Sequence, residues 1–405
     1  MSGRVIVSCL VLLAAVSACA ADEALKYITS DPSQLNPAPL MQSSKFAKPA
    51  AEAGTVNSHA IAVTMRASWG TASVAIDSDS VDVKQPDLLR IDFTGQGKFD
   101  KLDKNSVLPL KPREGYADRT GMYVAEFGPK LLQMSREGKT IPVTVWGTYQ
   151  KMPGSRYIMM YVCAAVEGKC KFGEKTYPVR IFDGNNNLKF SEAPKSTQRL
   201  ASLMYGQVDQ LAIDTGDGKF SQESVIRGWS GQPVSVDGKV YTLKVAADLS
   251  GISAEPLDAP MARVHIDHEK WSAVLIGDKY LMNVSGGKEP VVLPADKYRF
   301  YQFVEYGKGA KGEAYKLQVY ADTADSKPTD VPADKTTELT AGTPLTGELT
   351  VSRVQDTASI SLRFADVGGK AVGSLLIEGK RPEKPKVEIV DSDGKHVYGA
   401  TLEYG

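Results

Sequence analysis

The chain has 405 residues, of which 42% are hydrophobic and 24% charged, and its 48 Lys and Arg residues balance its 48 Asp and Glu residues. This composition indicates a globular protein of about two to four domains. The even charge balance excludes a basic nucleic-acid-binding surface and a polyanionic tail. With only four His and four Cys residues, the chain has few side chains that could bind a transition metal or take part in thiol chemistry.

Residues 1–21 are typical of an export signal, with Arg4 before the apolar stretch Val5 to Val16 and small residues after it. The stretch is too short for a stable membrane span. The sequence Val16-Ser17-Ala18-Cys19 is similar to a bacterial lipobox, which would make Cys19 the lipid-bearing first residue of a lipoprotein. Alternatively, Ala18-Cys19-Ala20 fits ordinary signal cleavage. Either outcome predicts an extracytoplasmic protein, periplasmic or on the cell surface, with membrane contact only through a lipid on Cys19.

The rest of the chain is expected to be mainly β, because hydrophobic and polar residues mostly alternate. Composition breaks divide it into a flexible tether at 22–53, a β-rich domain at 54–150, a β-rich domain with Asp/Asn loops at 151–255, a β-sandwich-like module at 256–320, a linker at 321–335 and an immunoglobulin-like sandwich at 336–405. Two short helices are expected, at Pro129 to Arg136 and at Ser196 to Tyr205. The predicted fold is therefore several β-sandwich-like modules with few short helices.

Three loops follow short apolar strands and begin with aspartate, at Asp92, Asp183 and Asp214, and each carries a Lys-Phe pair. They resemble the D-x-[DN]-x-[DN]-G calcium loops of EF-hand and dockerin modules. Calcium takes six to eight oxygen ligands, which alternate positions of a tight loop can supply. The candidate ligands are Asp92, Thr94, Gln96, Asp103, Asp183, Asn185, Asn187, Glu192, Asp214, Asp217 and Glu223.

The loops carry few charges, so calcium affinity is expected in the weak range of extracellular modules, roughly 0.1–1 mM. A second interpretation needs no ion, because Asp, Asn and Gly are also the residues that close β-turns through side-chain hydrogen bonds to the backbone. Both interpretations stay open at the level of sequence.

Cys163 and Cys170 are the internal cysteine pair, and in an exported protein a disulfide is the default. The flanking residues predict two strands joined by a turn at Glu167-Gly168. A bridge across that hairpin would add about 2–3 kcal/mol. The alternative, a redox-active dithiol, ordinarily uses a C-x-x-C spacing that these cysteines do not have.

One polar cluster, His265, Asp267, His268 and Glu269, has metal-ligating chemistry. On a strand, His265 and Asp267 share a face while His268 points to the other. Zinc needs three or four converging ligands, so two would have to come from elsewhere. A solvated strand end is the simpler interpretation.

The order of export signal, Asp/Asn loops on strands and a C-terminal immunoglobulin-like segment ending in Glu403-Tyr404-Gly405 resembles uncharacterised secreted proteins and lipoproteins of planctomycete-type bacteria. The resemblance implies no established activity. We expect a non-enzymatic extracytoplasmic protein with calcium-stabilised loops and a structural or surface-interaction role toward cell-envelope partners. Two alternatives stay open: a carbohydrate-binding protein that uses exposed Trp and Tyr, and a glycan hydrolase with dispersed carboxylates.

Overall fold

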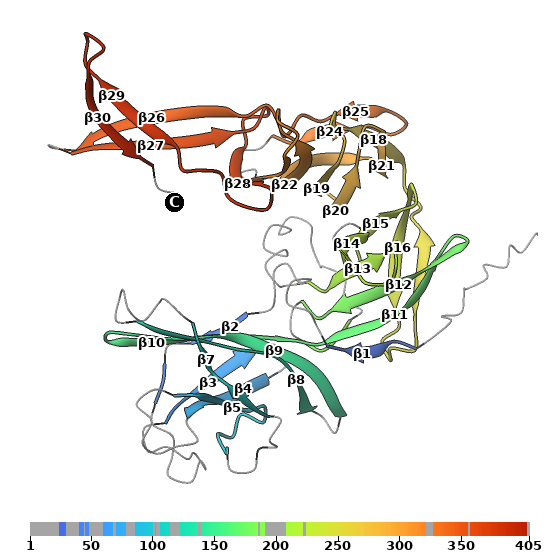
Figure 1. Ribbon diagram of the computed structural model, residues 1–405. Helices are drawn as coiled ribbons and strands as arrows, with labels where there is room; N and C mark the ends of the chain where they lie inside the picture. Colours follow the sequence, from blue (N-terminus) through green and yellow to red (C-terminus); the bar gives the residue numbers. More distant parts are fainter. Residues whose placement is uncertain are drawn as a thin grey trace, which may run out of the picture.

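The computed structural model describes residues 24–29, 40–43, 45–47, 60–67, 70–77, 86–99, 102, 106–113, 122–136, 139–184, 187–190, 208–221, 224–320, 327–354 and 357–402. The expected signal segment, with Cys19, lies outside these residues. The described elements are all β-strands, which confirms the mainly-β, multi-sandwich prediction (Figure 1). Within the described part, no helix is long and apolar enough to cross a membrane.

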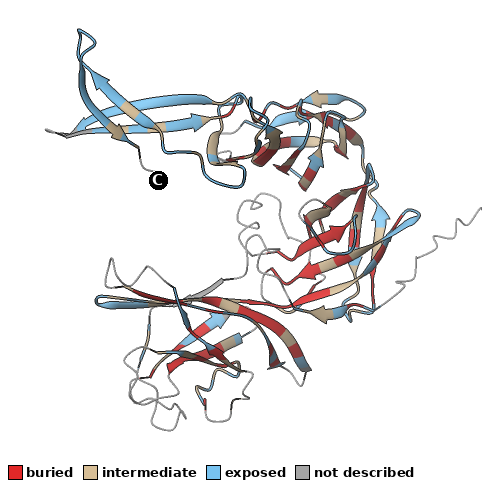
Figure 2. Ribbon diagram, in the orientation of Figure 1, coloured by how far each residue is buried: buried red, intermediate tan, exposed pale blue. Residues whose placement is uncertain are grey.

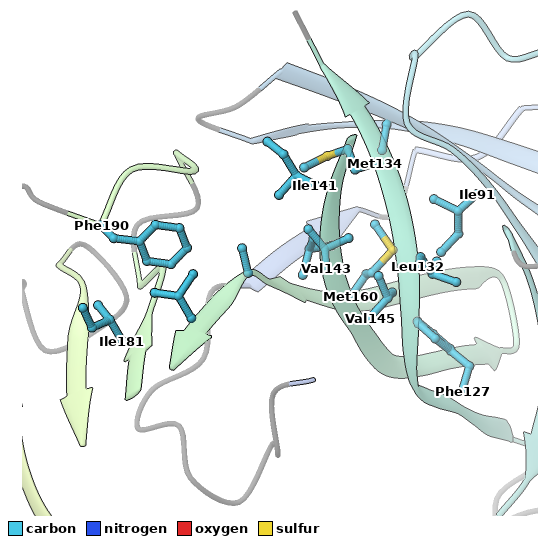
Figure 3. Packing of buried hydrophobic residues seen from close by; sticks show 14 of the residues in the cluster. Ile91, Phe127, Leu132, Met134, Ile141, Val143, Val145, Met160, Ile181 and Phe190 are labelled. Atoms are coloured by element: carbon cyan, nitrogen blue, oxygen red, sulfur yellow. The ribbon is translucent and has the colours of Figure 1, made fainter. Parts of the chain in front are cut away.

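The first sandwich packs one sheet, in the order β2-β10-β9-β8-β7, against another, in the order β3-β4-β5-β6. Its strands are β2 (Leu40–Ser43), β3 (Ile61–Ala67), β4 (Gly70–Asp77), β5 (Leu88–Asp92), β6 (Val107–Pro109), β7 (Lys111–Pro112), β8 (Tyr123–Arg136), β9 (Lys139–Met152) and β10 (Ser155–Cys163). Figure 3 shows Ile91 of one sheet facing Leu132, Val143 and Met160 of the other. Alternate residues of each strand fill this core, as a period of two requires.

One helix prediction is wrong, because Pro129 to Arg136 belongs to strand β8. Leu132 and Met134 are fully buried, whereas Leu131 and Gln133 are exposed, which is the alternation of a strand. Leu, Lys, Gln, Met and Arg all favour helices, but this weak local preference yields to pairing with the equally long strand β9. The other expected helix, Ser196 to Tyr205, lies outside the described residues.

The second sandwich packs the sheet β1-β11-β12-β13-β14 against the sheet β15-β16-β17. Its strands are β1 (Lys26–Ile28), β11 (Ala165–Phe172), β12 (Lys175–Phe182), β13 (Gln210–Asp214), β14 (Val225–Trp229), β15 (Pro233–Val236), β16 (Lys239–Val245) and β17 (Ile252–Pro256). Only Ala164 separates β10 of the first sandwich from β11 of the second. The chain therefore changes from one sheet to the other at residue 164.

The third sandwich places the sheet β21-β18-β25 over strands β20, β19, β22 and β23 of a larger sheet. Its strands are β18 (Met261–His265), β19 (Trp271–Ile276), β20 (Leu281–Gly286), β21 (Val291–Pro294), β22 (Asp296–Lys308), β23 (Ala314–Tyr320), β24 (Thr329–Val331) and β25 (Thr336–Glu338). Trp271, Phe303 and Leu317 are buried between the two sheets.

The remaining strands extend from the third sandwich: β26 (Thr346–Val354), β27 (Thr357–Ala365), β28 (Ala371–Ile377), β29 (Lys386–Val390) and β30 (His396–Thr401). They include the strands expected of the immunoglobulin-like module, but these do not form a sandwich of their own. Strand β25 pairs with β18 and β28 pairs with β23, so both belong to the third sandwich. The hairpins β26–β27 and β29–β30, here called the C-terminal arm, are largely exposed (Figure 2).

Candidate functional site

The aspartate that opens each expected calcium loop is buried at the end of a strand. Asp92 ends β5, Asp183 follows β12 and Asp214 ends β13, and at most 3% of each residue is exposed. Each loop also contains a buried phenylalanine: Phe99, Phe190 or Phe220. Each loop is thus held at its first residue by a carboxylate and near its end by an aromatic ring.

In the first loop, both carboxylate oxygens of Asp92 accept hydrogen bonds from the loop itself. Its Oδ1 accepts from the Thr94 amide at 2.8 Å and from the Thr94 hydroxyl at 2.6 Å. Its Oδ2 accepts from the Gly97 amide at 2.8 Å. Gln96 is exposed, and Asp103 lies outside the described residues.

The second loop repeats this arrangement. Asp183 Oδ1 accepts from the Asn187 amide at 3.0 Å, and Oδ2 accepts from the Leu188 amide at 2.7 Å. Leu188 occupies the position of the usual glycine and adopts a left-handed φ of 65°. Such a conformation is unfavourable for leucine, and the hydrogen bond to the buried carboxylate helps to hold it. Two further candidates, Asn185 and Glu192, lie outside the described residues.

In the third loop, Asp214 Oδ1 accepts from the Gly216 amide and from the Ser224 hydroxyl, while Oδ2 accepts from the Phe220 amide at 2.8 Å. Burial alone would raise the pKa of the Asp214 carboxyl, but these hydrogen bonds outweigh it and hold the pKa below its usual range. Asp217 lies apart from this network and forms an ion pair with Lys219 at 2.9 Å. Glu223 lies outside the described residues.

The three loops therefore share one structural feature: a buried carboxylate accepts hydrogen bonds from backbone amides across the loop. These contacts correspond to the second interpretation of the sequence, in which aspartate closes a turn without an ion. Among the described residues, no group of three or more His, Cys, Asp or Glu side chains is placed to hold a metal. Calcium binding stays a prediction.

The predicted disulfide between Cys163 and Cys170 does not form. Glu167 and Gly168, expected to turn the chain, lie inside strand β11, opposite residues of β12. Cys163 ends a strand of the first sandwich and Cys170 lies in the second. Seven residues of extended chain span about 20 Å, far beyond the Cα separation of about 7 Å that a bridge tolerates. Both cysteines are buried.

The residues of the possible zinc cluster diverge. His265 Nδ1 lies 2.7 Å from Glu338 Oε2 on the neighbouring strand β25, and this hydrogen bond raises the pKa of His265. His268 points elsewhere, with Nε2 2.7 Å from the Ala341 carbonyl and Nδ1 3.3 Å from Glu305 Oε1. The imidazoles of His265 and His268 therefore form separate hydrogen bonds within the third sandwich and do not converge on a common point.

The buried carboxylate of Glu305 is not among the site residues predicted from the sequence. It accepts hydrogen bonds from the Tyr315 hydroxyl and from both the amide and the hydroxyl of Thr343, the latter two at 2.8 Å. Together with His268, these groups join β22, β23 and the segment before β26. An acidic residue in an apolar strand pattern is the only signal that the sequence offers for it, and its partners are up to 38 residues away.

The C-terminal arm presents an apolar face that nothing covers among the described residues. Across β26 and β27, Leu349 pairs with Leu362 and Val351 pairs with Ile360. Directly paired residues of antiparallel strands share a face, so these side chains form one apolar strip with Phe364. The intervening pairs form the other face and are polar: Glu348 with Arg363, Thr350 with Ser361, and Ser352 with Ser359. Leu349 and Val351 are 52% and 62% exposed.

The second hairpin of the arm also carries exposed apolar side chains, among them Val390 and Val397, which are 53% and 62% exposed. Val387 pairs with Ala400, and Ile389 pairs with Tyr398, which is 57% exposed. A two-stranded hairpin is at best marginally stable in water on its own. An exposed apolar strip on such a hairpin is typical of a surface that contacts another protein segment.

Comparison of the chain with protein-family models found no match, and no curated protein or solved structure is significantly similar to it.

Proposed function

We propose that the protein is a non-enzymatic structural component outside the cytoplasm, and that its copies associate through the C-terminal arm. The main observation behind this proposal is the apolar strip of β26 and β27, on which Leu349 and Val351 are more than half exposed. The signal-like segment at residues 1–21 supports the extracytoplasmic location.

The apolar strip of the arm is continuous with the inner face of the larger sheet in the third sandwich. Ala365 of β27 pairs with Ala371 of β28, which pairs with the exposed Tyr320. Their neighbours Phe364, Val372 and Val319 therefore share the opposite face, on which Val319 is fully buried in the third sandwich. The arm thus extends the inner face of the sandwich beyond the sheet that covers it. A second sheet layer over the arm would complete the same architecture.

A second copy of the chain supplies such a layer. The apolar side of β29–β30, formed by Val387, Ile389, Tyr398 and Ala400, is the counterpart that each arm carries. In a two-fold pair, β29–β30 of each copy lies on β26–β27 of the other, so both apolar faces are covered at once. This reciprocal contact closes the assembly at a dimer.

Most charges of the arm lie away from this contact, because Glu348 and Arg363 pair on the polar side of β26–β27 and Lys386 and Glu388 alternate in sign on β29. Arg353 lies at the end of the apolar strip, opposite Ala358. The contact is small, with about nine apolar residues from each copy. Interfaces of this size are usually weak, so we expect a dissociation constant of roughly 1–100 µM.

Sedimentation velocity over a concentration series tests the proposal. We expect the wild-type protein to dimerise, and Val351→Glu to weaken dimerisation at least tenfold because a charge would be buried in the contact. Thr350→Glu is the matched control, since it lies one residue away on the polar face and should dimerise like the wild type. A wild-type protein that stays monomeric, or equal effects of the two variants, would contradict the proposal.

A further inference from the structure

A crevice lies between the second and third sandwiches, where the outer faces of two sheets meet. One wall is formed by β13 and β14, on which Gln210 pairs directly with Trp229 and shares its face. The other wall is formed by β19, β20 and β22, on which Val274 pairs with both Asn283 and Gln302. The crevice has a volume of about 150 Å³. Side chains from segments far apart in the sequence converge on it.

The crevice is lined by groups that both donate and accept hydrogen bonds. Asn283 and Gln302 contribute amides, and Ser272, beside them on β19, contributes a hydroxyl. Within the part of the chain that the structure describes, these three side chains have no hydrogen-bonding protein partner. Gln210 adds a third amide that is only 7% exposed. An amide offers two donors and one acceptor oxygen, which suits a ligand whose own groups do both.

An aromatic ring and a guanidinium group complete the lining. Trp229, which is 5% exposed and packed among apolar side chains, and Arg227 both line the crevice. No Asp or Glu side chain belongs to the described lining, so the chemistry does not favour a metal ion or an amine. An apolar ring with several two-way hydrogen-bonding groups is the usual composition of a small-molecule site at a domain interface.

The two walls are held in fixed relation. Gln232, after β14, accepts a hydrogen bond from the Leu281 amide of β20 at 2.8 Å through its side-chain oxygen. Trp229, Val274, Ile276 and Leu281 pack together across the junction. A crevice with rigid walls loses little conformational entropy on binding, which favours ligand affinity.

We infer that this crevice binds one pyranose unit of a glycan, a site that is independent of the arm. A volume of about 150 Å³ limits the ligand to a single ring-sized unit rather than a longer chain of sugars. The hydroxyl groups of a sugar both donate and accept, which matches Asn283, Gln302 and Ser272. The C–H groups of the ring provide the apolar surface that packs on the apolar part of the lining, which includes Leu211, Val274 and the edge of Trp229. Arg227 allows the sugar to carry either a hydroxymethyl or a carboxylate group.

Affinity electrophoresis of the full chain in gels containing soluble polysaccharides tests the site. The probes are a neutral β-glucan, a neutral mannan and a polyuronate, and we expect at least one to retard the wild-type protein. Asn283→Leu and Gln302→Met keep the side-chain volume but remove the amide. Each should weaken the retardation constant about tenfold, as the loss of one or two hydrogen bonds predicts.

The matched control is Gln318→Met, because Gln318 pairs with Val304 on the same outer face but lies outside the crevice lining. It should bind like the wild type, and all three variants should keep the wild-type melting temperature. Retardation by the polyuronate alone, lost in Arg227→Gln, assigns the site to acidic glycans, and retardation by a neutral polysaccharide assigns it to neutral ones. The inference is overturned if no polysaccharide retards the wild type, or if both crevice variants bind like the control.

Discussion

A single carboxylate in each Asp loop organises a segment that has no regular secondary structure. The clearest case is Asp214, which accepts hydrogen bonds from Gly216, Phe220 and Ser224 while fully buried. Hydrogen bonds to a charged acceptor contribute more than neutral ones, and an unpaired buried donor is costly. The loop therefore depends on this side chain whether or not calcium is present.

We predict that Asp214→Ala lowers the free energy of unfolding by about 2–4 kcal/mol, measured by urea denaturation in the presence of a chelator. Asp217→Ala, in the same loop but with its carboxylate paired to Lys219 at the surface, should change it by less than about 1 kcal/mol. The opposite pattern, in which Asp214→Ala matters only when calcium is added, would instead establish the loop as an ion site.

The difference in stability between the wild type and Asp214→Ala should depend on pH. Because the folded-state pKa of Asp214 lies below its ordinary value of 3.8, its contribution is fully present above pH 3.8 and is lost as the pH falls through the folded value. The stability gap between the wild type and Asp214→Ala should accordingly be constant near neutral pH and shrink below pH 3.8. The sequence pattern identifies this residue but not its role, because turns and calcium loops use the same residue types.

At the level of elements, strand β8 shows where local pattern and tertiary pairing disagree. Its Leu131-Leu132 pair and helix-favouring neighbours suggested a helix, whereas the fold extends the segment along β9. The choice depends on a partner strand that begins beyond the segment itself, so no short window of sequence contains it. A strand with clean alternation, such as Ile360 to Phe364 in β27, carries the signal from which the mainly β fold is predicted.

The strand geometry of β8 predicts that substitutions of the adjacent residues Leu131 and Leu132 have very different effects on the free energy of unfolding. Leu132→Ala should destabilise the protein by about 2–5 kcal/mol, because Leu132 is fully buried between the sheets of the first sandwich. Leu131→Ala should change stability by less than about 1 kcal/mol, because Leu131 is 38% exposed. Chemical denaturation of the two variants measures both values. Equal losses would contradict the period of two.

At the scale of the whole molecule, the sequence predicts the class of fold but not which strands share a sheet. The segment 336–405, expected to form a module of its own, does contain β-strands. However, β25 pairs with β18 and β28 pairs with β23, because long-range pairing joins them to earlier segments of the chain. The crevice could not be predicted for the same reason, since the pair Gln210–Trp229 and the pair Asn283–Gln302 come together only where two sandwiches meet. The exposed strip of the arm is likewise a consequence of those pairings.

Disulfide trapping of the double variant Leu349→Cys, Ile389→Cys tests whether the arms of two copies cover each other reciprocally. Both side chains are exposed, on β26 and β29 respectively, and the wild type under the same oxidant controls for the native cysteines. We predict that mild oxidation at micromolar concentration gives a disulfide-linked dimer on a non-reducing gel. Bridges formed only within single chains, or no bridge at all, would contradict a reciprocal contact between two copies.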